Sequence, residues 1–364
     1  MEAVLQDLAL NLASARKYEL ALLTTPGFDQ SRMREYFSHT WQVRGARPGK
    51  YSIRWWMGAP NAKSEWAAWA PDVILSISSA AGSFRLHRFW NHSPIIAQCH
   101  GTAWHEVKSS LASLSPKEAV KIPINVTRIA RERFAYGRFD HTIAISDGVR
   151  EQLSRAPLSV PPSKLSIIPN YVDTNKWSFD RNARDQVREI LNLSPSCKIA
   201  LFAGRLHRQK GIDLAIQAMS TLPISQWHFI ICGTGPQANE LKRMASDYGL
   251  TDRVHFVGQI NRENLPRYYS AADLLVFPTR RREGLPMNIL EALASGLPVL
   301  TCKNANLPPD LADKVVYAQP TSASVAGAWL SIPPLPGRSS QLPDRYSLTA
   351  ALGEYEELLD QISR

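Results

Sequence analysis

Short apolar runs alternate with amphipathic stretches along most of the chain, a pattern typical of parallel α/β sheets. In the first half, this pattern predicts strands over residues 19–24, 73–77, 94–99, 141–146 and 165–170. In the second half, it predicts strands over residues 198–203, 227–232, 254–257, 273–277 and 298–301. Helical periodicity predicts helices over residues 1–15, 148–153 (with Asp147 as its N-cap), 211–219, 236–248, 263–270, 286–294 and 347–363. The fold class is therefore α/β, with two doubly wound Rossmann-like domains.

A polar, proline-rich stretch at residues 156–164 separates the two sets of strands. We expect a first domain over residues 1–165 and a second over residues 166–340, which agrees with a length of 364 residues. A second proline-rich break follows at residues 333–338. Residues 341–364 are expected to form a C-terminal helix that packs back on the first domain.

Composition excludes several classes of protein. With 44% hydrophobic and 20% charged residues, the chain is neither disordered nor collagen-like. No apolar run approaches the roughly 18 residues of a membrane span. The first residues carry Glu2 and Asp7 and lack a basic leader, so we expect no signal peptide. The four cysteines form no CxxC pair, which disfavours a disulfide framework or a zinc site and favours a reducing, cytoplasmic location.

The charge is basic and unevenly distributed. The chain has 42 Lys and Arg against 32 Asp and Glu, a net charge of +10, and 21 of the basic against 13 of the acidic residues lie up to Lys164. The basic residues gather around residues 44–54, 85–88 and 117–138. Such a surface can meet nucleic acid, anionic lipid or a phosphorylated substrate, or it can simply be solvated. Because no nucleic-acid recognition motif is present, we expect no nucleic-acid partner.

Candidate chemistry follows the strands of the second half, where doubly wound sheets bind their ligands. The segment from Gly204 to Gly211 brings two cations, Arg205 and Lys210, between glycines that allow close backbone approach, which suits a diphosphate. The Gly233-Thr234-Gly235-Pro236 turn opens a helix whose amides could face an anion. Each pattern by itself also fits an ordinary turn or a solvated loop.

The loop after the strand at residues 273–277 is more informative. It contains Glu283 and leads into a helix that carries Asn288 and Glu291. The helix N-terminus between the two carboxylates offers amides and a positive dipole. Carboxylates on either side of a phosphate-binding helix start can accept hydrogen bonds from sugar hydroxyls. Alternatively, Glu283 is a surface charge and Glu291 an ordinary helix-face residue.

Taken together and in this order, the motifs resemble those of the retaining glycosyltransferases of family 4, which have the two-domain GT-B architecture with a cleft between the domains. The resemblance is clearest from residue 167 to residue 301. It rests on Ile168-Pro169-Asn170-Tyr171-Val172-Asp173, Gly204-Arg205-Leu206 with Lys210-Gly211, Gly233-Thr234-Gly235-Pro236, Val254-His255-Phe256-Val257-Gly258, Tyr269-Ser270-Ala271-Ala272-Asp273, and Glu283-Gly284-Leu285-Pro286 continuing to Glu291-Ala292.

The resemblance implies a role for each matching position. Arg205 and Lys210, after Gly204, would neutralise the donor diphosphate and stabilise the leaving nucleotide. Glu283 would hold a hydroxyl of the donor sugar beside the amides of Gly284 and Leu285, Glu291 would hold the ribose, and Gly233 and Val257 would line the nucleotide pocket. His100, at the end of the strand over residues 94–99, would lie close to the transferred sugar; it could also be a structural loop histidine. His105 and Glu106 would orient that loop or touch the acceptor.

No cofactor or bound metal is implied, because fixed cations and a helix dipole would meet the developing negative charge. No DxD pair stands at a strand end, which agrees with a metal-independent enzyme.

The chain departs from the family pattern in three places. Tyr171 stands where the family often has glycine. A segment rich in Asn and Pro at residues 304–310 replaces the expected glycine-rich turn, which casts doubt on the adjacent edge of the sheet. Finally, residues 1–9 resemble the family's first helix, so a preceding strand and glycine-rich turn of about 15 residues are missing; we expect in-frame upstream DNA to encode them.

The sequence thus predicts a retaining glycosyltransferase that uses a nucleotide diphosphate sugar and builds a cell-surface polysaccharide, lipopolysaccharide or glycolipid. The acceptor would be a saccharide or a glycolipid at the cytoplasmic membrane face, where the protein could bind peripherally to anionic lipid. Five tryptophans among the basic residues suit a membrane interface or an acceptor site, although some would belong to the core: Trp41, Trp55, Trp56, Trp66 and Trp69. The alternative is a catalytically impaired binding or scaffold protein of the same fold.

Overall fold

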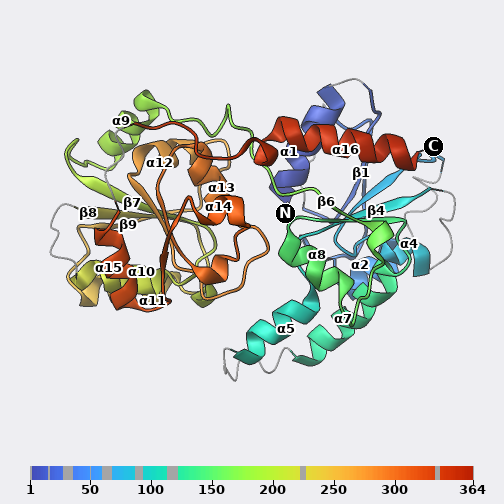
Figure 1. Ribbon diagram of the computed structural model, residues 1–364, viewed down its shortest axis with the longest axis horizontal. Helices are drawn as coiled ribbons and strands as arrows, with labels where there is room; N and C mark the ends of the chain where they lie inside the picture. Colours follow the sequence, from blue (N-terminus) through green and yellow to red (C-terminus); the bar gives the residue numbers. More distant parts are fainter. Residues whose placement is uncertain are drawn as a thin grey trace. The chain divides into compact units, whose positions relative to one another are not determined.

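The computed structural model describes residues 2–14, 17–27, 36–49, 51–59, 68–86, 93–112, 122–221, 227–332 and 337–363. It divides into two compact units, residues 1–170 with 348–364, and residues 171–347 (Figure 1). The chain thus crosses between units a few residues after the expected boundaries at 165 and 340. Trp66, Arg88, Lys117 and the start of the second proline-rich break lie outside the described residues.

The first unit contains two parallel sheets. Strands β3 (Ile74–Ile77), β4 (Ile95–Cys99), β5 (His141–Ala144) and β6 (Leu165–Ile167) form one sheet in the order β3-β4-β5-β6. Strands β1 (Ala21–Thr24) and β2 (His39–Gln42) form a separate pair. Every residue of β4 is buried, as expected for a strand covered on both faces, whereas β1 and β3 are mostly half-buried.

Helices surround these sheets: α1 (Glu2–Ser14), α2 (Ile53–Gly58), α4 (Gly82–Leu86), α5 (Ala103–Ala112), α7 (Ile122–Tyr136), α8 (Asp147–Ser154) and α16 (Leu348–Ile362). Helix α16 lies against α1, and Lys17 forms an ion pair of 3.0 Å with Asp360 (Figure 1). The expected N-cap of α8 is wrong by one residue. Ser146 adopts the extended conformation and accepts a hydrogen bond from the Val149 amide, so Asp147 is the first helical residue.

The second unit is a six-stranded parallel sheet in the order β12-β11-β10-β7-β8-β9. Its strands are β7 (Lys198–Ala203), β8 (Trp227–Cys232), β9 (Val254–Gly258), β10 (Leu274–Phe277), β11 (Val299–Cys302) and β12 (Val316–Ala318). The chain builds outward from β7 to β9 and then returns to add β10 on the other side of β7. This reversal makes the β7–β10 junction the topological switch point of the sheet.

The segment that departs from the family pattern does not disrupt this sheet. Strand β12 pairs in parallel with β11, beyond residues 304–310, and completes the edge. The helices of the unit are α9 (Arg181–Ile190), α10 (Ile212–Thr221), α11 (Ala238–Asp247), α12 (Leu265–Ala271), α13 (Met287–Ala294), α14 (Pro309–Ala312) and α15 (Ser322–Leu330), with 3-10 turns at η3 (Arg208–Lys210) and η4 (Lys303–Ala305).

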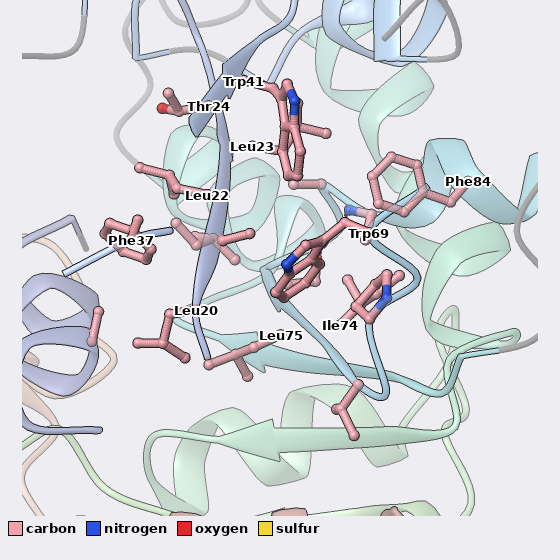
Figure 2. A pocket seen from close by; sticks show the side chains of 18 of the residues that line it. Leu20, Leu22, Leu23, Thr24, Phe37, Trp41, Trp69, Ile74, Leu75 and Phe84 are labelled. Carbon is pink, nitrogen blue, oxygen red and sulfur yellow. Dashed lines mark hydrogen bonds between the residues drawn. The ribbon is translucent and has the colours of Figure 1, made fainter. Parts of the chain in front are cut away.

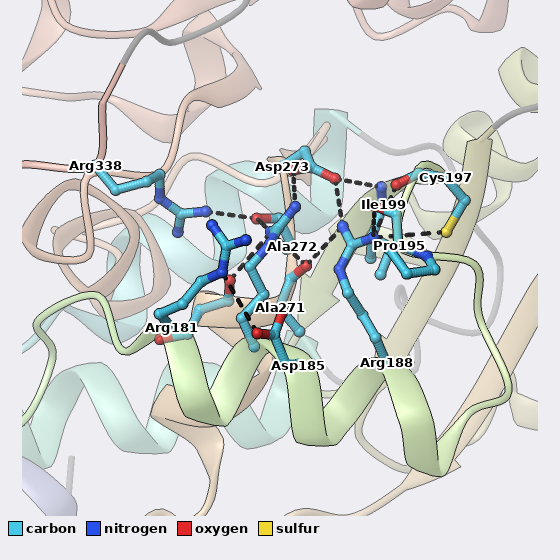
Figure 3. Close-up of polar contacts among 12 residues, drawn as sticks. Arg181, Asp185, Arg188, Pro195, Cys197, Ile199, Ala271, Ala272, Asp273 and Arg338 are labelled. Carbon is cyan, nitrogen blue, oxygen red and sulfur yellow. Dashed lines mark hydrogen bonds and ion pairs between the residues drawn. The ribbon is translucent and has the colours of Figure 1, made fainter.

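A polar cluster ties helix α9 to the amino-terminal ends of β7 and β10 (Figure 3). The Asp273 carboxylate accepts hydrogen bonds from Arg184 (2.7 Å), from Arg188 (2.9 Å) and from the Ile199 amide (2.8 Å). Arg338 donates to the neighbouring Ala272 carbonyl, and burial together with Arg184 lowers the pKa of Arg338 to about 10. Because ligands bind at the opposite, carboxyl ends of such strands, this cluster serves the scaffold.

Two further features bear on function. Within the described residues, no helix is both long and apolar enough to cross a bilayer. The tryptophans of the basic half divide between roles: Trp55 and Trp56 are buried, whereas Trp41 and Trp69 are half-buried, with ring centroids 6.4 Å apart in an edge-on contact.

Candidate active site

The residues expected to meet a diphosphate sugar gather at the switch point of the second unit. The carboxyl end of β7 leads to Gly204, Arg205 and, through η3, to Lys210. The carboxyl end of β10 leads to Thr279 and Glu283, and then to the start of α13. Because β7 and β10 are parallel neighbours, their carboxyl ends share one edge of the sheet.

An ion pair joins the two strand ends. Lys210 Nζ lies 2.9 Å from Glu283 Oε1, and the Thr279 hydroxyl lies 2.9 Å from the same oxygen. Both side chains of the pair are largely shielded, at 24% and 11% exposure, and Thr279 is completely buried. Lys210 also lies 5.2 Å from the ring centroid of Phe277. Low exposure strengthens the interaction, so a cation and a carboxylate stand preorganised at this edge.

The loop that carries Glu283 is held from two sides. Arg280 makes a bidentate ion pair with Asp213 of α10, with both distances 2.7 Å, and donates to the Arg208 carbonyl of η3. On the other side, Glu283 N donates to the Asn304 carbonyl, and the Asn304 side chain donates to the Arg280 carbonyl. The asparagine-rich segment that departs from the family pattern therefore supports the Glu283 loop.

Two glycines allow the strand ends to approach one another closely. A Cβ on Gly233 would collide with the Gly204 carbonyl oxygen. Gly211 has φ +74°, and a Cβ there would collide with the Pro278 carbonyl oxygen. Gly233 N also donates to the Gly258 carbonyl at 2.7 Å, which joins the ends of β8 and β9 next to Val257. At these positions the absence of a side chain allows the backbone segments after the strands to contact one another.

Glu291 occupies the first turns of α13 and is 4% exposed. Its two carboxylate oxygens accept hydrogen bonds from Arg262 (3.1 Å) and from the Tyr269 hydroxyl (2.9 Å). Burial and the nearby carboxylate raise the pKa of Tyr269 well above its usual range, so this hydroxyl remains a donor. The Glu291 carboxylate is therefore buried and held in place by these two donors.

Arg205 differs from these residues. It is exposed, and no ion pair to it occurs within the part of the chain that the structure describes. Gly284 and Leu285 connect Glu283 to the N-terminus of α13, where the helix dipole is positive. A free cation, a cation–carboxylate pair and a helix N-terminus at one sheet edge are suited to binding an anionic group with hydroxyl-bearing neighbours.

His100 lies in the first unit, directly after β4. Its Nε2 atom is buried and has no hydrogen-bond partner among the described residues. Burial lowers the pKa of His100 to about 3, so the imidazole is neutral at physiological pH. The ring is thus available for hydrogen bonding rather than as a charge.

The loop after His100 contains groups that sequence reasoning did not single out. Glu132 of α7 accepts a hydrogen bond of 2.8 Å from the Ala103 amide at the start of α5, and burial raises the pKa of Glu132 to about 7. Glu106, expected to orient the loop or touch an acceptor, forms an ion pair with Arg128 of α7.

Other supporting residues also escaped the sequence pattern. Arg262 and Tyr269 precede Glu291 by 29 and 22 positions, and Asp213 precedes Arg280 by 67 positions. Tyr269 belongs to the motif Tyr269-Ser270-Ala271-Ala272-Asp273, but nothing in that motif indicates a contact with Glu291.

Two family models match the chain at the positions of its two units. The model described as Glycosyltransferase Family 4 matches residues 1–176, and the model described as Glycosyl transferases group 1 matches residues 183–323. The chain belongs to glycosyltransferase family 4, and its fold is of the GT-B type. The expected family and fold class are confirmed.

Curated relatives match mainly through part of their length. The GDP-mannose-dependent alpha-(1-6)-phosphatidylinositol monomannoside mannosyltransferase of Mycolicibacterium smegmatis is 34% identical over 161 residues, which is 42% of each chain. The lipopolysaccharide core biosynthesis mannosyltransferase LpsB of Rhizobium meliloti is 36% identical over 177 residues, 46% of each chain. The matches thus span about half of the length of these relatives.

Solved structures resemble the whole chain in fold. Sucrose-phosphate synthase from Thermosynechococcus elongatus is 22% identical with a TM-score of 0.78, over 98% of this chain and 92% of that one. HepE of Anabaena, solved with UDP and glucose, is 18% identical with a TM-score of 0.74, over 99% of this chain and 95% of that one.

Proposed function

We propose that this protein is a retaining glycosyltransferase that moves a sugar from a nucleotide diphosphate sugar to a saccharide or lipid-linked acceptor in cell-surface glycan biosynthesis. The family membership and the printed activities of the mannosyltransferase relatives support this function. The observation that carries the proposal is the ion pair between Lys210 and Glu283 at the switch point; Arg205, which follows the same strand β7, is exposed.

In this proposal, Arg205 and Lys210 bind the donor diphosphate. As the sugar–oxygen bond breaks, negative charge accumulates on the leaving diphosphate, and fixed cations that are already in place stabilise that charge. The N-terminus of α13, after Gly284 and Leu285, adds its dipole. These groups belong to the protein itself, so we propose that transfer requires no bound metal or other cofactor.

Glu283 holds a donor-sugar hydroxyl, and Glu291 holds the ribose. Arg262 and Tyr269 hold the Glu291 carboxylate in place, and a carboxylate is the acceptor group that paired ribose hydroxyls require. Gly233 and Val257 line the nucleotide pocket. The neutral His100 contacts the transferred sugar. We nominate no protein nucleophile; the oxygen of the leaving diphosphate assists deprotonation of the acceptor on the same face, which retains the anomeric configuration.

The acceptor side suits a membrane surface. Helix α2 exposes Ile53 (61%) and Met57 (69%) next to the exposed Arg54, and the Arg44 carbonyl lies close to Gly58 at the end of that helix. Apolar side chains among cations are the combination that binds an anionic bilayer surface. We propose that the protein acts in the cytoplasm, bound peripherally to the membrane that carries a glycolipid acceptor.

A panel of nucleotide sugars tests this function. Release of nucleotide is measured with each donor, with and without lipid and saccharide acceptors. The proposal predicts that an acceptor stimulates nucleotide release with one donor. The transferred sugar should have the same anomeric configuration in the product as in the donor. A product of opposite anomeric configuration would contradict the retaining mechanism. If no nucleotide sugar bound and no nucleotide were released, the proposed glycosyltransferase activity would be contradicted.

The alternative, a non-catalytic scaffold of the same fold, is favoured by one observation, the division of the first unit's strands between two sheets. A chain that binds a nucleotide sugar in a thermal-shift assay without transferring it would support this second candidate.

A further inference from the structure

The two units differ in the groups that they offer to a ligand. The first unit contains a cavity that borders β1 and β3, and Glu19 is the only charged residue of its mainly apolar lining (Figure 2). Such a lining has few groups that could select one polar ligand over another. The second unit instead buries a polar cluster around Glu291, and this cluster contains more than the two donors described above.

Arg262, in the turn between β9 and α12, is held from two sides. Its Nη1 lies 3.1 Å from Glu291 Oε1, and its guanidinium carbon lies 5.6 Å from the ring centroid of Trp177. The Arg262 side chain is 22% exposed and that of Glu291 is 5% exposed. At such low exposure, an ion pair and a cation–π contact are both stronger than they are at a surface.

Trp177, which precedes α9, is itself fixed. It is fully buried, and its ring makes an edge-on contact with the Tyr269 ring at 5.1 Å between centroids. The Trp177 amide donates to the Asp173 carbonyl at 3.0 Å, which closes a turn. The Ser295 hydroxyl lies 2.7 Å from the Trp177 carbonyl and 2.9 Å from the Glu291 carbonyl. Trp177 therefore offers Arg262 a rigid surface that is joined to α13.

The contact with Arg262 reduces the freedom of the Glu291 side chain. A glutamate has three rotatable side-chain bonds, and fixing them costs conformational entropy. Arg262 restrains Oε1 and the Tyr269 hydroxyl restrains Oε2, so this cost is met in the folded protein before a ligand arrives. A ligand with hydroxyl groups then meets an acceptor that is already oriented, and preorganisation of this kind increases affinity.

We propose that Arg262 is a positioning residue for nucleotide recognition: held against the Trp177 ring, it fixes the orientation in which the Glu291 carboxylate accepts the ribose hydroxyls. This inference rests on the proposed function, in which Glu291 holds the ribose. Arg262 acts through Glu291 and makes no contact of its own with the nucleotide.

Binding of nucleoside diphosphates to the 364-residue chain, measured by titration calorimetry, tests this role. The probes are UDP, GDP and their 2′,3′-dideoxy counterparts. The quantity compared is the ratio of the dissociation constants of the dideoxy form and the ribose form. We expect the wild type to bind the ribose form about tenfold or more tightly, because the dideoxy form lacks both hydroxyl hydrogen bonds.

Arg262→Met should reduce this ratio to about twofold or less, while the affinity for the dideoxy form stays within about twofold of the wild type. A merely structural role, or a direct contact of Arg262 with the diphosphate, would weaken both probes equally and leave the ratio unchanged; that result would overturn the proposal. Arg267→Met is the matched control, since Arg267 is a half-buried arginine of α12 that pairs with Gln186 at 2.6 Å. It should keep the wild-type ratio.

A double-mutant cycle identifies the residue through which Arg262 acts. Addition of Arg262→Met to Glu291→Gln should change the affinity for the ribose form by no more than about twofold, because the carboxylate to be positioned is already absent. A larger further loss would show that Arg262 binds the nucleotide independently, and the proposal would be wrong. This comparison also holds if Arg262→Met alone does not fold, since both of its variants lack the buried carboxylate.

The outcomes separate this inference from the proposed function. If no probe binds the wild type, the proposed function is contradicted and the inference with it. If the wild type prefers the ribose form and Arg262→Met keeps that preference, only the role of Arg262 is contradicted.

Discussion

Lys210 and Glu283, 73 positions apart in the sequence, form an ion pair of 2.9 Å across the carboxyl ends of β7 and β10. The two charges neutralise each other before any ligand binds, and the Thr279 hydroxyl donates a hydrogen bond to the carboxylate. The pair therefore arrives preorganised. An incoming diphosphate would compete for the ammonium group, and a sugar hydroxyl would then donate to the carboxylate.

We predict that Glu283→Gln and Lys210→Ala each reduce transfer by a factor on the order of 10²–10³, because each removes one preorganised charged contact. The initial rate of nucleotide release at saturating donor measures this loss. Cooperative thermal unfolding of each variant checks that the loss is not caused by unfolding.

Glu189→Gln is the matched control, because Glu189 is an exposed carboxylate on α9, at the amino ends of the strands. It should retain full activity. Near-wild-type turnover in Glu283→Gln or Lys210→Ala would remove these two residues from the proposed donor site.

A second prediction concerns the support of the Glu283 loop. Arg280→Lys cannot reproduce the bidentate contact with Asp213, because an ammonium group is a point charge without the planar fork of arginine. We expect kcat/KM to fall by about tenfold, corresponding to about 1.4 kcal/mol, through a less well-placed Glu283. Steady-state kinetics with Arg181→Lys, an exposed arginine on α9, as the control would check this; equal kinetics in the two variants would contradict it.

A third prediction separates stability from catalysis. Asp273→Asn leaves Arg184 and Arg188 without their carboxylate partner, and Arg188 is 3% exposed. Breaking a buried pair from one side costs about 3–5 kcal/mol, so urea unfolding should show a markedly lower midpoint. Below the unfolding transition, donor binding should be unchanged, because the cluster lies at the opposite end of the strands. If Asp273→Asn were as stable as the wild type, the prediction would be wrong, and water would have to solvate Arg184 and Arg188 in place of the carboxylate.

The sequence pattern located the strands that consist mainly of apolar residues. Strand β7, Lys198–Ala203, has the bounds that its run of apolar residues predicts. Helix α9 escaped prediction because its inward face includes Arg188, which is buried only because Asp273 neutralises it 85 positions later. Strand β2, His39–Gln42, also escaped, since its composition is largely polar. In both cases long-range pairing, rather than hydrophobic periodicity, determines the structure.

The candidate site shows the same division. The family pattern selected Lys210, Glu283 and Glu291, and the structure places the first two in contact. The partners of Glu291, Arg262 and Tyr269, lie in preceding elements and carry no local signal. That these residues bind a donor stays a prediction, because a sequence pattern indicates where a side chain lies and not which ligand it binds.

A fourth prediction addresses the membrane. The protein should bind vesicles that contain anionic lipid. It should dissociate from them as the salt concentration rises, because screening shortens the reach of exposed charges to about 10 Å at 0.1 M.

Met57→Ser should weaken vesicle binding by about tenfold, since insertion of such a side chain contributes at least about 1.5 kcal/mol. Sedimentation with vesicles measures both effects, and Leu330→Ser, another exposed apolar residue in the second unit, is the control. Equal binding to neutral and anionic vesicles would contradict the proposed surface.

The last prediction concerns Glu132, whose pKa burial raises from an ordinary 4.5 to about 7. Between these two values the folded state retains a proton that the unfolded state has released. The contribution of the protonated carboxyl to stability is therefore complete below about pH 4.5 and is lost as the pH rises to about 7. A difference of two to three pKa units corresponds to about 3 kcal/mol.

Glu132→Gln removes this pH dependence, because the amide stays neutral and its oxygen can still accept the hydrogen bond from the Ala103 amide. Urea unfolding should show equal stability for the variant and the wild type at pH 4, and a variant that is more stable by up to about 3 kcal/mol at pH 8. Glu106→Gln, which alters the less buried neighbour paired with Arg128, should not produce this pH-dependent gain. If the stabilities of Glu132→Gln and the wild type differ by a constant amount from pH 4 to pH 8, Glu132 does not titrate in this range, and an ionised carboxylate holds the start of α5.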